Sequence, residues 1–194
     1  MEYAISDFAM DDPLGVGLQI VYEDDSLPAQ DLTIYQGHDY AFRDWPDGGE
    51  LNRTHVLAHT FDPADEDRQV EATFFLAGAF GTHRSARLWY ASGEHDSASD
   101  LPVELITNGF GTVLDSAPLV GGDGNAWDTL TEMVTIPAGA TYVSFQFESG
   151  DGTLGDWPES FSWVSTSIAM VPEPTTLSLL ALGGASLLRR RRRR

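Results

Sequence analysis

Apolar and polar residues alternate one by one through several stretches of this chain, and this period-two pattern constrains the fold more than any other feature. Residues 143–148, Val-Ser-Phe-Gln-Phe-Glu, show it most clearly, and residues 16–22 and 70–76 repeat it. Successive side chains of a β-strand point to opposite faces, so each stretch is predicted to be a half-buried strand with one apolar face.

Less regular apolar runs predict further strands, at residues 32–35, 56–61, 87–91, 103–107, 130–136 and 161–170. Clusters of Gly and Asp that favour turns separate the runs, for example at residues 47–49, 121–124 and 149–152. No amphipathic helix is predicted before residue 171. Many short strands joined by Gly, Asp and Pro loops are typical of an all-β fold, so we predict that residues 1–170 form one antiparallel β-sandwich, similar to a jelly roll.

The charge balance argues against nucleic acid as a partner. The chain has 30 acidic residues, 11 basic residues and a formal net charge of −19. Without Glu173 and the six arginines of residues 189–194, 29 acidic residues stand against five arginines, and this balance of −24 would repel a phosphate backbone. The chain contains no cysteine, so its stability must come from a packed core rather than from disulfides or thiolate metal sites.

Residues 171–194 combine three features in a fixed order. Pro172, Glu173 and Pro174 form a stiff, extended segment, because proline restricts its own φ and the residue before it. The uncharged stretch of residues 175–188 follows, and as a helix it would be about 20 Å long, which is short for a permanent membrane anchor. A positive cluster that would stay on the cytoplasmic side of a membrane comes last: Arg189, Arg190, Arg191, Arg192, Arg193 and Arg194.

This order resembles the PEP-CTERM sorting signal, in which a Pro-Glu-Pro motif precedes a short apolar helix and a basic cluster. The resemblance covers about an eighth of the chain. It implies recognition of Pro172, Glu173 and Pro174 by an exosortase, a membrane-embedded cysteine transpeptidase of Gram-negative bacteria that also make exopolysaccharide. The implied route is export and transient anchoring in the inner membrane, followed by transfer to the cell surface or extracellular matrix.

An exported protein also needs an N-terminal signal, with a basic region followed by an apolar region. Residues 1–15, MEYAISDFAMDDPLG, contain neither. We therefore expect that the sequence begins after its true start and that a signal peptide precedes it.

Residues 136–149 and 160–174 resemble the last strands of jelly-roll modules in surface proteins that carry this tail. Those modules are similar to carbohydrate-binding and galactose-binding-like domains. The resemblance implies the fold and leaves the ligand open.

Two loops repeat the tripeptide Asp-Trp-Pro, with the tryptophans at Trp45 and Trp157. An indole held beside a carboxylate could stack on the face of a sugar while the acid accepts hydrogen bonds from sugar hydroxyls. In the competing interpretation, which we favour for each loop taken alone, the tryptophan folds back over the open end of the sandwich and covers the core.

His55 and His59 stand four residues apart in His-Val-Leu-Ala-His. On a helix this spacing would suit zinc, but Thr54, Val56 and Thr60 favour a strand, in which the two histidines would share a face about 13 Å apart. The motif also lacks the glutamate of the zinc-protease signature. We interpret both as surface histidines and predict no metal site from them.

Two acidic segments carry oxygen ligands that suit calcium, residues 62–67, DPADED, and residues 121–128, GGDGNAWD. Neither has the spacing of an EF-hand loop, and we favour solvated turns over a structural calcium site. No other cofactor is predicted.

The sequence shows no catalytic signature. It lacks a Gly-x-Ser-x-Gly elbow and a phosphate-binding glycine loop, and among 29 acidic residues a pair spaced for glycoside hydrolysis carries no information. We therefore predict that the protein is not an enzyme but a structural surface or matrix protein associated with exopolysaccharide. The alternatives are a carbohydrate-binding module that uses Trp45 or Trp157 and, more remotely, a small glycoside hydrolase.

Overall fold

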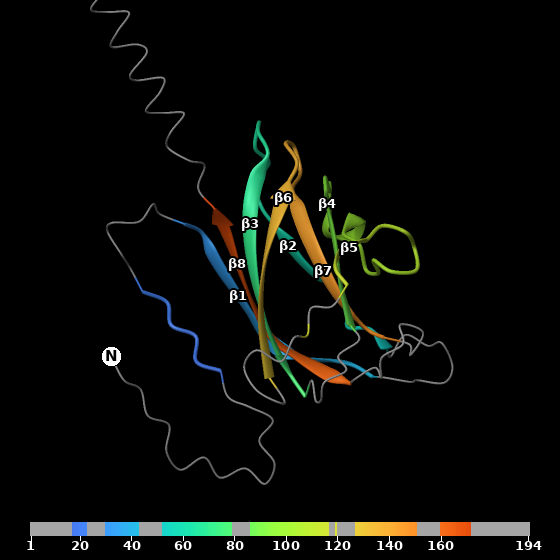
Figure 1. The fold of residues 1–194 in the computed structure, drawn as a ribbon. Coiled ribbons are helices and arrows are strands. Elements are labelled where there is room, and N and C mark those ends of the chain that lie inside the picture. Colours follow the sequence, from blue (N-terminus) through green and yellow to red (C-terminus); the bar gives the residue numbers. More distant parts are fainter. Residues whose placement is uncertain are drawn as a thin grey trace, which may run out of the picture.

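The computed structural model describes residues 17–22, 30–42, 52–78, 86–116, 119, 127–150 and 160–171. Strands in these ranges form two four-stranded antiparallel sheets that pack face to face (Figure 1). One sheet, sheet A, contains in spatial order β1 (Leu32–Ala41), β8 (Phe161–Val171), β3 (Arg68–Ala77) and β6 (Trp127–Ile136). The other, sheet B, contains β2 (Leu57–Thr60), β7 (Tyr142–Ser149), β4 (Ala86–Gly93) and β5 (Thr112–Asp115).

The strands pair as one long hairpin that has been rolled up. β1 pairs with β8, β2 with β7, β3 with β6 and β4 with β5, all antiparallel. The chain therefore doubles back in the connection between β4 and β5, which contains the short 3-10 helix η2 (Ala98–Asp100). Additional pairing of β3 with β8 and of β4 with β7 completes the two sheets. This topology is that of a jelly roll and confirms the predicted all-β sandwich. The predicted apolar helix in residues 175–188 lies outside the described residues.

The inward faces of the two sheets meet in an aromatic core. The ring centroid of Phe74 on β3 lies 5.1 Å from that of Phe145, 5.3 Å from that of Phe147 and 5.9 Å from that of Trp163. All four side chains are buried. The two phenylalanine pairs are edge-to-face, a geometry that adds attraction beyond the burial of apolar area. Aromatic packing between sheets A and B thus takes the place of a disulfide in this cysteine-free chain.

Most of the predicted strands are confirmed, because their alternation faces this core. The predictions at residues 143–148 and 70–76 fall in β7 and β3. The less regular runs that coincide or overlap with β1, β2, β4, β6 and β8 are those at residues 32–35, 56–61, 87–91, 130–136 and 161–170. No predicted strand corresponds to β5, whose four residues are too few to establish a period.

The strand predicted at residues 16–22 is wrong for its described part, residues 17–22, which joins neither sheet. Leu18, Ile20 and Tyr22 alternate as in a strand, but they are 57%, 50% and 73% exposed. Period-two alternation forms a strand only where a neighbouring strand and a second apolar layer complete it, and this segment has neither.

The strand predicted at residues 103–107 is also wrong. This segment bends over the outer face of sheet B, where Leu105 is fully buried and its backbone N–H donates to Oε1 of Gln146 at 2.8 Å. Nε2 of Gln146 in turn donates to the carbonyl oxygen of Thr54 at 2.8 Å. The polar face of β7 is therefore covered, and the prediction of a half-buried strand fails there, since Ser144 and Gln146 are 0% and 1% exposed.

Candidate functional site

A β-bulge in β8 shifts the inward-facing positions of this strand by one residue. Trp163 faces the core, and the next core-facing residue is Thr166 rather than Ser165. The pairing with β3 shows the same shift. Phe75 pairs with Ser165 and the adjacent Leu76 pairs with Trp163, so Val164 has no partner on β3. As a result the indole Nε1–H of Trp163 donates to Oγ1 of Thr166 at 2.6 Å. The bulge thus gives a buried indole N–H the partner that it needs.

The ladder between β1 and β8 is irregular at the same level. Gly37 and His38 of β1 together oppose the single residue Val164 of β8. Bulges bend a strand and re-aim its side chains, and they are common beside functional sites. Two hollows lie at this bulge, one at the edge of the sandwich and one on the outer face of sheet A, and these three residues line both.

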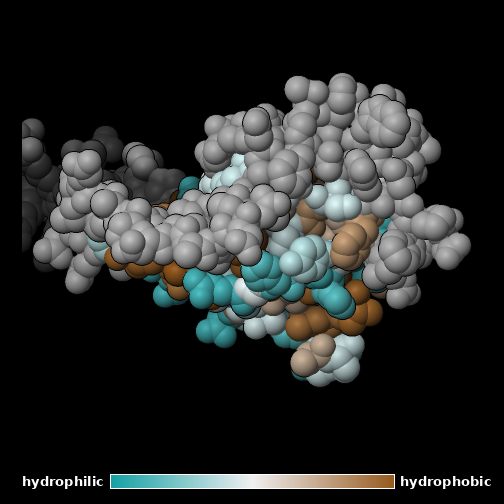
Figure 2. Space-filling model, turned by 90° about the horizontal axis from the view of Figure 1, so that it is seen from below, coloured by the Kyte–Doolittle hydropathy of each residue, from teal (hydrophilic) through white to brown (hydrophobic). Residues whose placement is uncertain are grey.

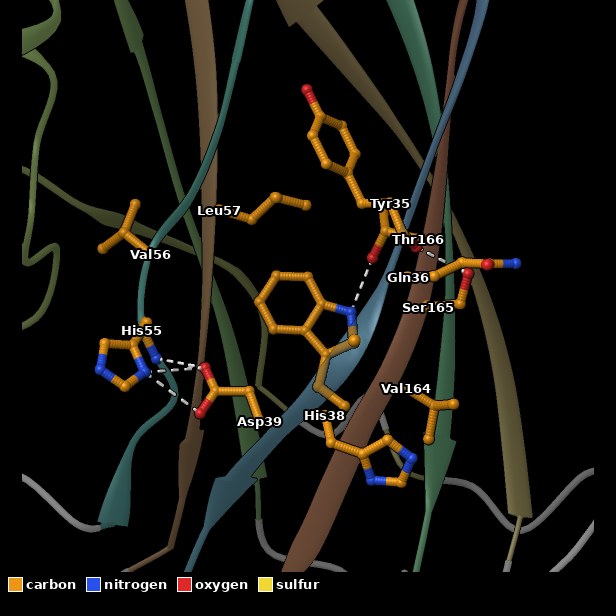
Figure 3. A pocket seen from close by; sticks show the side chains of 12 residues that line it. Tyr35, Gln36, His38, Asp39, His55, Val56, Leu57, Val164, Ser165 and Thr166 are labelled. Carbon is orange, nitrogen blue, oxygen red and sulfur yellow. Dashed lines mark hydrogen bonds and ion pairs between the residues drawn. The ribbon is translucent and has the colours of Figure 1, made fainter.

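The first hollow, which we name the edge cleft, lies between β1 and the start of β2 and has a volume of about 260 Å³ (Figure 3). β1 and β2 are edge strands of the two sheets on the same side of the sandwich. The cleft is lined by Tyr35, Gln36, Gly37, His38, Asp39, His55, Val56, Leu57, Trp163, Val164, Ser165 and Thr166.

Asp39 and His55 point toward each other at the edge cleft (Figure 3). Oδ2 of Asp39 accepts the backbone N–H of His55 at 2.6 Å, and both carboxylate oxygens lie 3.2 Å from Nδ1 of the ring. The imidazole is 96% exposed, and the contact becomes an ion pair only when that ring is protonated. Within the described ranges, the hydrogen bonds of the ring are those to Asp39.

A second polar contact joins β1 directly to β2. The hydroxyl oxygen of Tyr35 on β1 lies 2.9 Å from Nδ1 of His59 on β2. Burial lowers the pKa of His59 below its ordinary value and raises the pKa of the Tyr35 hydroxyl. Both shifts favour the neutral forms, and with the imidazole proton on Nε2 the tyrosine hydroxyl donates to Nδ1.

The two histidines of His-Val-Leu-Ala-His therefore contact different residues of β1. The interpretation as a surface histidine holds for His55 and is wrong for His59, which is partly buried. The described part of the chain contains no group of three or more His, Cys, Asp or Glu side chains arranged to hold a metal ion.

The second hollow, which we name the outer groove, has a volume of about 400 Å³ and lies on the outer face of sheet A. It is lined by Gly17, Gln19, Gln36, Gly37, His38, Phe75, Trp127, Val164 and Ser165. Gln36 on β1, Ser165 on β8 and Phe75 on β3 pair in register and form one row across three strands. The same row continues to Thr129 on β6, whose Oγ1 accepts the indole N–H of Trp127 at 3.3 Å.

Segment 17–22 forms one wall of the outer groove. A methyl group added to Gly17 would lie 2.8 Å from Cζ2 of Trp127, so the backbone approaches this indole as closely as only glycine allows. The groove is not predicted from the sequence, because Trp127 is assigned there to an acidic segment, whereas it begins β6. The sequence does contain a signal for the bulge. The buried apolar residues of β8 occupy odd-numbered positions at Phe161 and Trp163 but an even-numbered position at Ile168.

The acidic segment at residues 62–67 is a connection tied to its neighbours. The carbonyl oxygen of Asp62 accepts a hydrogen bond from Arg68 at 2.7 Å, and Oδ1 of Asp67 accepts the backbone N–H of Ala138 at 2.9 Å. In the second acidic segment, residues 121–126 lie outside the described residues.

The remaining predicted site residues also lie outside the described residues: Trp45, Trp157, Pro172, Glu173, Pro174 and Arg189 to Arg194. Strand pairing nevertheless places the flanks of the two Asp-Trp-Pro loops together. Ala41 before the first loop pairs with Phe161 after the second, and Arg53 after the first forms a bridge with Glu148 before the second. Both loops therefore leave the same end of the sandwich.

Two solved adhesin domains of Lys-gingipain from Porphyromonas gingivalis W83 are similar in fold. The K3 domain is 15% identical, with 68% of this chain and 69% of that chain covered and a TM-score of 0.37. The K1 domain is 13% identical, with 73% and 91% covered and a TM-score of 0.37. The structure of the Gx strain of infectious bursal disease virus is 10% identical over 79% of this chain, with a TM-score of 0.42, and this chain spans 37% of it.

No curated protein matches the chain. Within the part that the structure describes, no helical segment has the length and apolar character needed to span a bilayer.

The family described as PEP-CTERM protein-sorting motif matches residues 171–193. The match begins at Val171, the last residue of β8, and includes Pro172, Glu173 and Pro174. The chain therefore carries a PEP-CTERM protein-sorting motif, which implies that it is exported, transiently anchored in a membrane and processed by an exosortase.

Proposed function

We propose that the protein is a non-catalytic component of the cell surface or extracellular matrix, delivered by an exosortase that recognises Pro172, Glu173 and Pro174 and associated there with exopolysaccharide. The sorting motif at residues 171–193 carries this proposal. The apolar stretch of residues 175–188 and the arginines that follow would hold the protein in the inner membrane of a Gram-negative cell until processing.

The end of β8 supports this arrangement. Val171 is both the last strand residue, paired with Gln69 of β3, and the first residue of the motif. The sandwich would therefore lie directly beside the membrane before processing. Its excess of acidic residues repels anionic lipid headgroups, so once the tail is removed nothing electrostatic retains the domain at the membrane.

Processing can be tested in cells that express the chain behind a signal peptide, with or without an exosortase. A shorter product is expected only with the enzyme, and Glu173→Ala should abolish the shortening. Glu71→Ala, at an exposed position of β3, is the matched control and should leave it unchanged. Equal shortening of both variants would exclude recognition of the Pro-Glu-Pro motif.

The second candidate function is carbohydrate binding by Trp45 and Trp157. The pairing of Ala41 with Phe161 favours it, because two loops with the same Asp-Trp-Pro tripeptide leave one end of the sandwich. Two indoles there could stack on successive units of one glycan, each beside a carboxylate that accepts hydroxyl hydrogen bonds.

A glycan array with the full chain tests this candidate. Binding should be lost in Trp45→Ala and in Trp157→Ala. It should be retained in Phe110→Ala, because this 69% exposed aromatic residue belongs to the connection that follows the last residue of β4, at the end of β4 that is remote from the two loops. Binding that survives both tryptophan substitutions would exclude the loops as the site.

A further inference from the structure

The outer groove is an uncharged surface in a strongly charged protein. Charged residues make up 21% of the chain and its formal net charge is −19, yet Asp, Glu, Lys and Arg are all absent from the described lining of the groove. A cationic ligand would find no carboxylate here and an anionic ligand no guanidinium. Electrostatics therefore favours a ligand without net charge.

The groove offers both apolar and hydrogen-bonding contacts. Phe75 and Trp127 supply aromatic surface from β3 and β6. Gln36 is exposed, and its side-chain amide makes no hydrogen bond with a described residue, so its donors and its acceptor face solvent. Because Gln36, Ser165 and Phe75 pair in register, these three residues follow one row across the strands, and Trp127 lies two residues away from that row on β6.

Further aromatic side chains extend this face toward the end of β1. The rings of Tyr40 and Phe42 stack with centroids 5.8 Å apart and an interplanar angle of 17°, and the two residues are 49% and 40% exposed. On the side of the molecule seen in Figure 2, brown hydrophobic residues likewise reach the surface beside teal hydrophilic ones. Exposed apolar surface beside polar groups is typical of binding surfaces.

We propose that the outer groove binds a neutral saccharide, whose ring face stacks on Trp127 and Phe75 while its hydroxyl groups hydrogen-bond to the amide of Gln36. Sugars combine apolar C–H faces with uncharged donors and acceptors, which is the combination that this lining offers. The β8 bulge shapes the site, since the groove lies where Val164 interrupts both ladders. The proposal rests on the proposed function for one point, that the protein meets polysaccharide outside the cell.

Isothermal titration calorimetry of the full chain against cellohexaose, laminarihexaose and maltohexaose tests the groove. At least one of these neutral oligosaccharides should bind, while the anionic polysaccharide alginate should not. Gln36→Ala should weaken binding about tenfold, the value of one to two well-made hydrogen bonds. Gln69→Ala is the matched control, because this glutamine lies on the outer face of the same sheet, outside the groove, and its amide donates to Thr135.

Trp127→Ala should abolish binding, and Trp127→Phe, which keeps an aromatic face, should retain most of it. Comparison of Gln36→Ala with Gln69→Ala keeps the test valid if Trp127→Ala does not fold. Equal affinities of these two glutamine variants, preferential binding of alginate, or no binding of any neutral oligosaccharide would overturn the proposal. Loss of binding only in Trp45→Ala and Trp157→Ala would assign the glycan to the loops instead, whereas failure of exosortase processing would leave the binding result unaffected.

Discussion

The hydroxyl oxygen of Tyr35 lies 2.9 Å from Nδ1 of His59, and this contact joins edge strand β1 of sheet A to edge strand β2 of sheet B. Asp39 and His55, each four residues away, make a second contact, between β1 and the segment that leads into β2. An edge strand presents unpaired backbone groups that invite association with other chains. Here two polar pairs hold the edges together, and one of them contains His59, whose pKa is lowered by burial.

Replacing His59 by Gln should flatten the pH dependence of stability between about pH 7.5 and pH 5.5. Burial lowers the folded-state pKa of His59 below the ordinary value of 6.5. Between these two pKa values the unfolded chain binds more protons, so the stabilisation is complete above pH 6.5 and is lost as pH falls toward the folded-state pKa. Urea unfolding at both pH values measures the difference.

His55→Gln is the control for this prediction, because its ring is almost fully exposed. We expect His59→Gln to lose less stability on acidification than either the wild type or His55→Gln. If all three lose the same amount, the Tyr35–His59 contact does not contribute to the pH response.

The opposite side of the sandwich carries an unfavourable pair of charges. Glu132 on edge strand β6 pairs with buried Ala72, and its pKa is raised, first by burial and then by the negative charge of Asp115 on β5. An inward-pointing charge on an edge strand costs stability but discourages association through that edge.

Glu132→Gln should therefore stabilise the protein at pH 7, by about 0.5 kcal/mol because the group keeps part of its solvent contact. Glu132 binds its proton more tightly in the folded state than in the unfolded chain. Protonation of Glu132 therefore contributes stability that is fully present below the ordinary pKa of 4.5 and is lost as the pH rises through the folded-state pKa. The gain should disappear near pH 4, and exposed Glu71→Gln should show no gain at either pH. Thermal unfolding at both pH values decides the matter.

Sequence periodicity predicts this fold where alternation meets the aromatic core, as in β3 and β7, because burial enforces the period. It fails where tertiary contacts decide. Residues 17–22 alternate without a partner strand, and Leu105 is buried by lying over β7 rather than within a strand. The change of phase in β8 signals the bulge, but the lining of the outer groove could not be predicted from local patterns, since Gln36, Phe75 and Trp127 become neighbours only through strand pairing.

Gln146→Ala should destabilise the protein by about 1–3 kcal/mol, because the Leu105 N–H and the Thr54 carbonyl would both lose their buried partner. Amide exchange at Leu105 should accelerate more than exchange at Phe74, since the covering segment would detach before the core opens. Exposed Gln36→Ala provides the comparison and should leave both stability and exchange near wild-type values. Unchanged exchange at Leu105 would show that Gln146 does not hold the segment.

Thr166→Val should also cost about 1–3 kcal/mol, although valine has nearly the shape of threonine, because it leaves the buried indole N–H of Trp163 without an acceptor. Thr73→Val removes a hydroxyl from the exposed face of β3 and should change stability by less than about 0.5 kcal/mol. In a double-mutant cycle with Trp163→Phe, which has no N–H, the Thr166→Val substitution should become nearly neutral. Chemical denaturation of the four proteins gives the coupling energy directly. A coupling near zero would mean that the bulge in β8 is maintained by packing alone and that the 2.6 Å hydrogen bond is a consequence of the bulge rather than a cause of it.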